Sequence, residues 1–448
     1  MHPKKFNLIV KDKINSYKKS IKVDSDKSIS IRSFLIGSIC NSISIVKNTL
    51  ESEDVLSTIR CLRLLGVKII KKKRKHYCIY GKGLGSLTAS KNLILNFGNS
   101  GTLARLLVGI LSTTPNIKVK IRGDGSLNKR SMKKLFNLMS LFGAVFKPKN
   151  KFKFPVKLIS SNNPVCIKYE SGISAQLKSA VILAALNSYG DTQILERFKS
   201  RDHTEKMLEN NNGVLKFKKG SIKRNIIIKG KKILKPLNVN VPGDPSSAAF
   251  FAALTLMNKD SSIKIKNIGL NTRRTGFYTL LKKHGAKINF LNVKKKNKEI
   301  YGDISIKNSK LKPIKASSKF YVNSTDEYPI LFVLASLING VSIFNGIGDL
   351  TNKESNRVLE MQKVLKQLGI KTKFYKNNLK IFGKGMIDAK RRNIFVPNLG
   401  DHRICMSVFI LSILTGAKAK IKNFETVFTS SPSFLKIMRE LGAKFEIQ

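Results

Sequence analysis

The chain has 448 residues, of which 42% are hydrophobic, so it is long and apolar enough for a buried core and for two or three domains. Its 84 Lys and Arg residues against 27 Asp and Glu give a net charge of +57, yet this hydrophobic content argues against a disordered polycation. Five cysteines without a CxxC spacing indicate neither a disulfide framework nor a zinc site, which favours a reducing cytoplasm.

No apolar segment followed by a small-residue cleavage site opens the chain, so we expect no secretory signal. The longest uncharged stretch, residues 328–348, is broken by proline, asparagine and glycine and predicts a buried helix followed by a strand, and only weakly a membrane span.

The excess of basic residues has three candidate explanations: a nucleic-acid binder, an enzyme with anionic substrates, or a compositional bias that places Lys wherever a solvated residue is tolerated. The densest basic runs, 71–75 and 294–296, lie between predicted strands. Such runs are typical of hairpin tips in water, which favours the bias.

Six strongly apolar helices are predicted, each directly after small or polar residues. They recur about every 75 residues, a sixth of the chain, in the segments 25–39, 98–111, 170–186, 242–257, 324–338 and 399–414. The residues expected to mark their N-termini are Ser28, Ser100, Ser174, Ser246, Asp326 and Asp401.

A second, amphipathic helix is predicted in each repeat, closed by a left-handed glycine that leads into a strand and a hairpin. These glycines are Gly66, Gly143, Gly213, Gly285, Gly369 and Gly442. Six such units on a quasi-symmetric plan predict a mixed α/β fold of two globular domains, each built from three βαβαββ-type units around buried helices.

Helix N-termini attract anions because they present unpaired N–H groups and the positive end of the helix dipole. Ordinary capping would explain Ser, Asp and Gly at these positions equally well. Charged residues in the first turns of buried helices favour the anion-site interpretation, and they are Lys27, Arg32, Arg105, Lys178, Asp326, Glu327, His402 and Arg403.

Nine motifs in this order and spacing resemble the 5-enolpyruvylshikimate-3-phosphate (EPSP) synthase family, 3-phosphoshikimate 1-carboxyvinyltransferases: DKSISIR, NSGTLAR, GDGSLNKR, SAQLKSA, RDHTE, PGDPSSAAF, TDEYPI, KESNR and GDHR. SAQLK and RDHTE resemble in particular its second, glyphosate-tolerant class. The resemblance implies that residues 1–22 with 243–448 form one domain, that 23–242 form an inserted domain, and that the active site lies in the cleft between them.

The activity that the resemblance implies is transfer of the enolpyruvyl group of phosphoenolpyruvate to the 5-hydroxyl of shikimate 3-phosphate, with release of phosphate, in the shikimate pathway to chorismate and the aromatic amino acids. It implies no cofactor and no metal. It also implies a cytoplasmic monomer without an obligate protein partner and without membrane association. From the charge we expect nucleic acid to bind only non-specifically, if at all.

The family motifs also imply roles for individual residues. For shikimate 3-phosphate the implied contacts are Lys27, Ser28, Arg32, Ser174, Ala175, Gln176, Arg201, Asp326 and Lys353. For phosphoenolpyruvate they are Lys27, Gly101, Arg130, Gln176, Arg357 and Arg403. The implied catalytic residues are Asp326, Glu354 and Lys27.

Asp326 precedes an apolar helix, where an unpaired carboxylate is costly, so we expect a raised pKa for it. His203 and Glu205 are expected to support Arg201, because no third residue at suitable spacing completes a metal site with them.

Several positions depart from the family pattern. Ser131 stands where proline is usual, Ile31 replaces a polar residue, Asn356 replaces an aspartate, and Thr429 or Ser430 stands where many relatives have a lysine. Gly101, where some tolerant relatives carry alanine, leaves room for glyphosate, so we expect more sensitivity to glyphosate than the class suggests.

Two rival functions remain open. The transferase acting on UDP-N-acetylglucosamine typically has a reactive cysteine in the loop equivalent to GDGSLNKR, and this loop has none. A basic RNA-binding or RNA-processing protein of related fold would show basic residues interleaved with aromatic ones, whereas Phe and Tyr are scattered here. A catalytically dead homologue is disfavoured because Lys27, Arg130, Asp326, Glu354 and Arg403 are all present.

Overall fold

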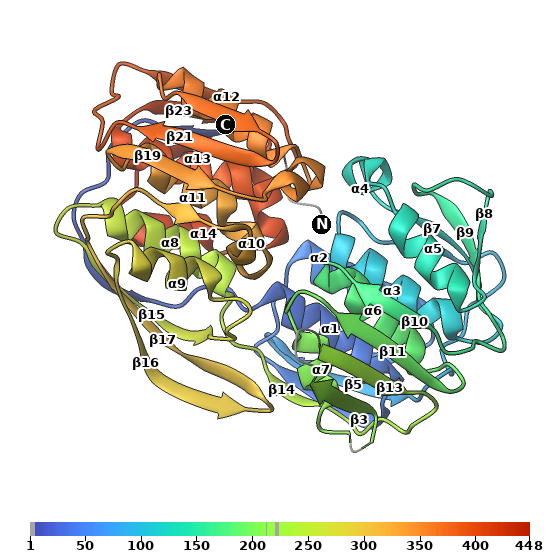
Figure 1. Ribbon diagram of the computed structural model, residues 1–448. Coiled ribbons are helices and arrows are strands. Elements are labelled where there is room, and N and C mark those ends of the chain that lie inside the picture. Colours follow the sequence, from blue (N-terminus) through green and yellow to red (C-terminus); the bar gives the residue numbers. More distant parts are fainter. Residues whose placement is uncertain (1–4, 212, 220–223) are drawn as a thin grey trace. The chain divides into compact units, whose positions relative to one another are not determined.

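The computed structural model describes residues 5–211, 213–219 and 224–448 (Figure 1). The chain divides into two compact units. Unit 1 comprises Met1–Asp24, Pro242–Lys295 and Ile300–Gln448, and unit 2 comprises Ser25–Val241 and Lys296–Glu299. Each unit buries its own hydrophobic core. No feature of the sequence indicated that residues 296–299 group with unit 2.

Unit 2 contains seven helices among its described residues. They are α1 (Lys27–Ile39), α2 (Glu53–Leu64), α3 (Gly101–Thr113), α4 (Gly125–Lys129), α5 (Lys133–Leu141), α6 (Ala175–Ala185) and α7 (His203–Leu208). Its strands are β3 (Asn41–Lys47), β4 (Lys68–Lys73), β5 (His76–Lys82), β6 (Ile94–Asn96), β7 (Lys118–Arg122), β8 (Val145–Lys147), β9 (Val156–Ile159), β10 (Lys168–Ser171), β11 (Asp191–Glu196), β12 (Leu215–Lys219), β13 (Arg224–Lys229) and β14 (Asn238–Asn240).

Unit 1 begins with β1 (Leu8–Val10) and β2 (Lys18–Ile21) and continues after unit 2. Its helices are α8 (Pro245–Met257), α9 (Gly276–Lys283), α10 (Ser318–Ser324), η1 (Thr325–Glu327), α11 (Tyr328–Ser336), η2 (Gly348–Asn352), α12 (Arg357–Gln367), α13 (His402–Thr415), η3 (Phe424–Thr429) and α14 (Phe434–Glu440). Its further strands are β15 (Ser262–Gly269), β16 (Lys287–Lys296), β17 (Glu299–Lys307), β18 (Lys315–Ala316), β19 (Gly340–Phe344), β20 (Thr372–Tyr375), β21 (Asn378–Gly383), β22 (Asn393–Val396), β23 (Lys418–Ile421) and β24 (Phe445–Ile447).

The sixfold repeat is confirmed in the sheets. The described residues form six four-stranded sheets, three in each unit, with the orders β14-β3-β5-β4, β6-β7-β9-β8, β10-β11-β13-β12, β2-β15-β17-β16, β18-β19-β21-β20 and β22-β23-β1-β24. In every sheet the first pair is parallel and the second pair antiparallel. The parallel pairs β6-β7, β10-β11 and β22-β23 are joined through the apolar helices α3, α6 and α13, as a parallel connection requires.

In two of the parallel pairs, the strand before the apolar helix does not pair with the strand after it. This happens at the two places where the chain passes between the units. The strand before α1 is β2, but it pairs with β15 of unit 1. The strand before α8 is β14, but it pairs with β3 of unit 2. Each unit therefore completes its third sheet with a strand from a distant part of the sequence.

The six apolar helices α1, α3, α6, α8, α11 and α13 form the centres of the two cores, as predicted (Figure 1). They are buried on nearly all sides, and α3 packs on α6 while α11 packs on α13. A helix that is apolar all round is stable only when it is enclosed in this way. Their side chains therefore pack in the core along most of each helix, and the polar residues lie in the N-terminal turns.

The helix caps differ in detail from the predicted markers. Ser100, Ser174 and Asp401 are N-caps whose side chains accept a backbone N–H, as predicted. The caps of α1 and α8 are Asp26 and Asp244, so the predicted markers Ser28 and Ser246 lie inside the first turn. Asp326 lies in the short 3-10 helix η1 before α11.

All six predicted glycines have positive φ angles, between +70° and +97°. Only glycine adopts this conformation at little cost, and it ends a helix by turning the chain toward the following strand. Five of the six directly follow the C-cap of a helix. Gly213 is the exception, because α7 ends at Leu208.

The basic run 71–75 occupies the exposed end of β4 and the turn to β5, and the run 294–296 is exposed at the end of β16. The hairpin interpretation of these runs is confirmed. Within the described ranges, no helix combines the length and the apolar character needed to span a membrane.

Candidate functional site

In unit 2, the first turn of α1 presents Lys27 and Ser28. Asp26 caps this turn by accepting the Ile29 N–H at 2.8 Å. The Lys27 ammonium lies 3.1 Å from a carboxylate oxygen of Asp54 on α2, and the two side chains are 17% and 6% exposed. Asp54 therefore holds the amine of Lys27 at the edge of the core, where part of it still reaches the surface.

Arg32 is buried in unit 2 and ties three helices together. Its Nε donates to Thr204 Oγ1 at 2.9 Å, and its Nη2 donates to Ser179 Oγ at 3.1 Å. Its Nη1 donates to the Ser28 carbonyl at 3.1 Å, which confirms that the two residues share one face of α1. Hydroxyl and carbonyl partners fix the orientation of this guanidinium without neutralising its charge.

Two guanidinium groups converge on the first residue of α3. Arg105 Nη1 donates to the Gly101 carbonyl at 2.9 Å, and Arg130 Nη2 donates to Asn99 Oδ1 at 2.6 Å. A Cβ atom on Gly101 would lie 2.8 Å from Arg105 Nη1 and 3.1 Å from Arg130 Nη1. The N-terminus of α3, capped by Ser100, thus meets two cations at a position without a side chain, which suits a small anion.

The N-terminus of α6 lies beside this cluster. Ser174 caps the helix, and Ala175 and Gln176 form its first turn with partly exposed side chains. Gln176 Nε2 donates to Thr102 Oγ1 on α3 at 3.0 Å. Residues from the NSGTLAR and SAQLK motifs therefore lie in direct contact.

Lys178 does not face a ligand-accessible surface, so the anion-site interpretation is wrong for this residue. Its side chain is 0% exposed, and its Nζ lies 2.6 Å from Glu196 and 2.7 Å from Glu205. Both carboxylates are as deeply buried as the lysine. A buried cation is tolerated only with such partners, so Lys178 belongs to the framework of unit 2.

The RDHTE segment separates its residues into two environments. Arg201 is half-buried, whereas His203 is buried and its Nδ1 lies 2.6 Å from Glu299 Oε1. Lys206 lies 3.2 Å from the other oxygen of Glu299. Burial opposes ionisation of Glu299, but His203 and Lys206 outweigh it and hold its pKa below the ordinary value. His203 thus supports this ion cluster, while Glu205 pairs with Lys178.

In unit 1, the KESNR motif leads from η2 into α12. Lys353 Nζ lies 2.5 Å from Asp349 Oδ2, the oxygen that also accepts the Tyr321 hydroxyl at 2.8 Å. Burial and the Asp349 carboxylate raise the pKa of Tyr321 far above its usual range, so this phenol is a neutral donor. Lys353 is about one-quarter exposed and remains accessible.

Arg357, the first residue of α12, is buried among three carboxylates. Its Nε donates to Asp401 Oδ2 at 2.9 Å, its Nη2 donates to Glu354 Oε2 at 2.6 Å, and its Nη1 lies 3.7 Å from Asp326 Oδ1. Burial would lower the pKa of this guanidinium, but Asp401 and Glu354 outweigh it and raise the pKa. Asp401 is fully buried, whereas the side chains of Glu354 and Asp326 are 24% and 26% exposed.

The surroundings of Asp326 in this cluster differ from those expected. The expectation of a raised pKa rested on an unpaired carboxylate in apolar surroundings. Asp326 is instead about one-quarter exposed and close to the Arg357 guanidinium. The buried carboxylate at the start of α11 is its neighbour Glu327, which accepts a hydrogen bond from Ser246.

Arg403 is the second residue of α13 and is only 4% exposed. Its backbone N–H donates to Asp401 at 3.0 Å, and its guanidinium lies 5.8 Å from the Phe250 ring centroid. Its Nε and Nη1 have no hydrogen-bond partner within the described part of the chain. Arg403 therefore places hydrogen-bond donors at the N-terminus of an apolar helix, next to the similarly buried His402.

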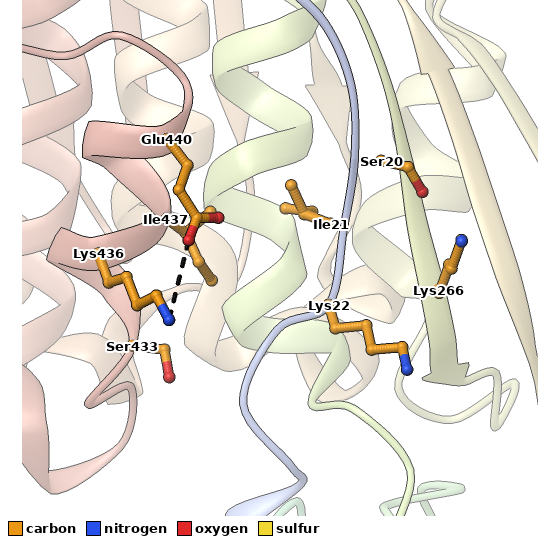
Figure 2. A pocket seen from close by; sticks show the side chains of 8 residues that line it. All are labelled: Ser20, Ile21, Lys22, Lys266, Ser433, Lys436, Ile437 and Glu440. Atoms are coloured by element: carbon orange, nitrogen blue, oxygen red, sulfur yellow. Dashed lines mark ion pairs between the residues drawn. The ribbon is translucent and has the colours of Figure 1, made fainter.

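Unit 1 also contains a separate cavity of about 380 Å³ beside α14 (Figure 2). Lys22, Lys266 and Lys436 line it, and Lys436 Nζ lies 4.0 Å from a carboxylate oxygen of Glu440. The described residues that line it include no predicted site residue. Among the residues that the structure describes, no group of three or more His, Cys, Asp and Glu side chains is placed to hold a metal ion.

Comparisons with known proteins agree with this set of motifs. The family model "EPSP synthase (3-phosphoshikimate 1-carboxyvinyltransferase)" matches residues 11–438. The chain belongs to the EPSP synthase family. A 3-phosphoshikimate 1-carboxyvinyltransferase of Zymomonas mobilis is 36% identical over 430 residues, covering 95% of this chain and 94% of the relative. Another, of Thermodesulfovibrio yellowstonii, is 38% identical over 445 residues, covering 97% and 99%.

A solved EPSP synthase of Acinetobacter baumannii superimposes with a TM-score of 0.84 at 32% identity, covering 99% of this chain and all of that chain. The mixed α/β fold with two domains is thus confirmed as that of EPSP synthases. With family relatives along 95% or more of its length, the chain is an enzyme, a 3-phosphoshikimate 1-carboxyvinyltransferase of the shikimate pathway.

The sequence did not reveal that two carboxylates of this EPSP synthase pair with cations of the site. Asp54 holds Lys27, and Asp401 holds Arg357. Asp401 was noticed as a helix marker, and its position directly before His402 and Arg403 was the available signal. Asp54 lies in the first turn of an ordinary amphipathic helix, and nothing in its local pattern distinguishes it from a surface residue.

The departures from the EPSP synthase pattern have visible local effects. Asn356 still caps α12 by accepting the Leu359 N–H at 3.1 Å, so loss of the usual aspartate preserves this helix start. Ile31 is buried in the core of unit 2. Ser430 is buried, and its hydroxyl has no hydrogen-bond partner among the described residues, whereas Thr429 donates to the Thr426 carbonyl at 2.8 Å.

Proposed function

We propose that the reaction of this family is divided between the residue set of unit 2 and that of unit 1. The observation that carries the proposal is the placement of arginines at helix N-termini in both units, at Gly101 of α3 and at the starts of α12 and α13. Both substrates are phosphorylated carboxylates, and guanidinium groups pair well with such anions. No other feature of the described site requires so many cations.

In unit 2, we assign shikimate 3-phosphate to the first turns of α1 and α6, which carry Lys27 and Ser28 and the run Ser174, Ala175 and Gln176. Arg32 and Arg201 add positive charge to this set. Arg32 is buried behind Ser28, so its contribution is electrostatic and structural as much as direct. Asp326 and Lys353 of unit 1 complete the contacts that we assign to this substrate.

We assign the phosphate of phosphoenolpyruvate to Arg130 and Gly101, since two guanidinium groups approach this glycine more closely than a side chain there would allow. The family motifs add Gln176 and Lys27 to the residues that we assign to phosphoenolpyruvate. In unit 1, Arg357 and Arg403 are assigned to the same donor molecule. Arg403 supports this assignment because its Nε and Nη1 have no hydrogen-bond partner among the described residues.

The chemistry needs three proton transfers. The acceptor hydroxyl loses a proton as its oxygen bonds to C2 of phosphoenolpyruvate, while C3 gains a proton; the intermediate then loses phosphate and a proton from C3. We assign Asp326 to the hydroxyl and Glu354 to C3, with Lys27 as a partner in the proton transfers. An anion that binds Arg357 would compete with Glu354 for Nη2, which leaves the more exposed Glu354 able to exchange a proton.

The test is a phosphate-release assay with purified protein, shikimate 3-phosphate and phosphoenolpyruvate. We expect phosphate release only when both substrates are present, and no release when UDP-N-acetylglucosamine replaces shikimate 3-phosphate. Phosphate release from phosphoenolpyruvate with UDP-N-acetylglucosamine as acceptor, and none with shikimate 3-phosphate, would favour the rival transferase. No release with either acceptor over a range of salt and pH would contradict the proposal.

We also propose that the chain belongs to the second class, on the basis of its SAQLK and RDHTE motifs, and that it is a cytoplasmic monomer, as the family resemblance implies. Gly101 makes a specific exception to the tolerance of that class, because a Cβ at this position would lie 2.8 Å from Arg105 Nη1 and 3.1 Å from Arg130 Nη1 and would crowd these two guanidinium groups. We expect glyphosate to compete with phosphoenolpyruvate, and Gly101→Ala to weaken this inhibition. Absence of inhibition at high glyphosate, with normal turnover, would contradict this expectation.

A further inference from the structure

Asp401 joins α12 and α13, the helices of unit 1 that carry Arg357 and Arg403. Its Oδ2 accepts the Arg357 Nε at 2.9 Å and the Ser355 hydroxyl at 3.0 Å. Its Oδ1 accepts the Arg403 backbone N–H at 3.0 Å and the Arg357 Nη2 at 3.3 Å. The residue is 0% exposed, so both of its oxygens depend entirely on partners within the protein.

These contacts orient the Arg357 guanidinium in one direction. A carboxylate that binds Nε and one terminal nitrogen holds the planar group along one edge, and the rest of the group then points in a fixed direction. Here the remaining donors face Asp326 and Glu354, the two partly exposed carboxylates. The buried partner therefore sets the geometry, while the exposed partners can exchange with a ligand.

The same carboxylate sets the start of the second helix. Asp401 is the N-cap of α13, and Arg403 is the residue whose N–H it accepts. The backbone from which the Arg403 side chain extends is thus fixed by the group that also fixes Arg357. One side chain therefore fixes the positions of two arginines, each at a helix N-terminus.

We propose that Asp401 is a positioning residue for the donor substrate: it holds Arg357 and Arg403 in the mutual arrangement that binds phosphoenolpyruvate. This inference rests on the proposed function and adds a residue to it. Asp401 itself touches no reacting atom. Its loss should weaken donor binding specifically and leave acceptor binding nearly unchanged.

Asp401→Asn is the informative substitution. Asparagine has the same shape and is an equally good N-cap, so α13 keeps its start, but the charge that holds Arg357 is lost. Loss of a charge-assisted hydrogen bond at a buried site corresponds to about a tenfold to hundredfold change in an equilibrium. We expect the KM for phosphoenolpyruvate to rise at least about tenfold, while the KM for shikimate 3-phosphate stays within about twofold.

Glu196→Gln is the matched control, because it also removes one buried carboxylate from a buried cation that keeps another carboxylate partner. It should lower the melting temperature without changing either KM. A merely structural role for Asp401 would give Asp401→Asn the same pattern. An unchanged KM for phosphoenolpyruvate in a folded Asp401→Asn protein would overturn the inference.

Ser355→Ala supplies a second variant in case Asp401→Asn does not fold. It removes one hydrogen bond to Asp401 Oδ2 and leaves every charge in place. We expect the KM for phosphoenolpyruvate to rise about two- to threefold, and no change would contradict the inference. Wild-type protein that releases no phosphate would overturn the proposed function, whereas active wild type with an unaltered Asp401→Asn would overturn the positioning role alone.

Discussion

Two buried cations, one in each unit, differ in a way that separates framework from site. Lys178 of unit 2 pairs with Glu196 and Glu205, and all three side chains are almost completely buried. Arg357 of unit 1 is equally buried, but two of its three carboxylate partners are about one-quarter exposed. The first cluster is closed, whereas the second contains groups that a substrate can reach.

The comparison shows that a charge in the first turn of an apolar helix does not by itself indicate a ligand site. What distinguishes the two cases is the exposure of the partners. Fully buried carboxylates satisfy a buried cation permanently, because releasing them would leave charges without compensation. Partly exposed carboxylates are solvated when displaced, so an anionic ligand can take their place at lower cost.

The largest expected effect is on turnover, from changing an exposed carboxylate of the Arg357 cluster. Asp326→Ala should slow kcat at least about a hundredfold, the usual range for removal of a general acid or base. Its melting temperature should stay near that of the wild type, because the side chain is partly exposed. Steady-state phosphate release and thermal unfolding measure the two quantities, and near-normal turnover would contradict the role of Asp326.

A change in the closed cluster should give the opposite pattern. Lys178→Met leaves Glu196 and Glu205 buried beside each other without their cation, so we expect a loss of about 3–5 kcal/mol in the free energy of unfolding. Denaturant unfolding measures this loss. The KM values of the folded fraction should be unchanged, and a large rise in either KM with normal stability would return Lys178 to the site.

The smallest effect is expected from a third ion cluster of intermediate exposure, that of Glu299, His203 and Lys206 in unit 2. The pKa of Glu299 is lowered: burial and Asp202 raise it, but the effects of His203 and Lys206 prevail. A lowered carboxyl pKa contributes stability that is present above the ordinary value of 4.5 and is lost as the pH falls through the lowered value.

Glu299→Gln should therefore cost about 1–3 kcal/mol at pH 7, and the difference from the wild type should shrink as the pH falls below 4.5. Urea unfolding at a series of pH values measures it. A difference independent of pH would show that Glu299 contributes through packing and not through its charge.

Much of the fold was predictable because it follows from local patterns. The six glycines with positive φ angles and the six apolar helices repeat at one period, and each signal has a direct backbone or burial cause. The exchange of β2 and β14 between sheets was not predictable from spacing alone, since it depends on which distant strands lie next to each other. The cleft between the domains stays a prediction.

The site was predictable where a motif combined charge with a helix start, as for Arg357 and Arg403. It was not predictable where two charged residues from different motifs pair. Lys178 looked like a cleft cation because its partners, Glu196 and Glu205, are 18 and 27 positions away and belong to other elements. Burial of a partner is a property of the folded chain and leaves no trace in local spacing.

The most direct test of the account compares Glu354→Gln with Glu196→Gln in one assay with both substrates. Each substitution removes a carboxylate charge from a buried cation, at 2.6 Å in both cases. We predict that Glu354→Gln lowers kcat at least about a hundredfold with little change in melting temperature, and that Glu196→Gln lowers the melting temperature with kcat within about twofold. Normal turnover of Glu354→Gln, or a comparable loss of turnover in stably folded Glu196→Gln, would contradict the account.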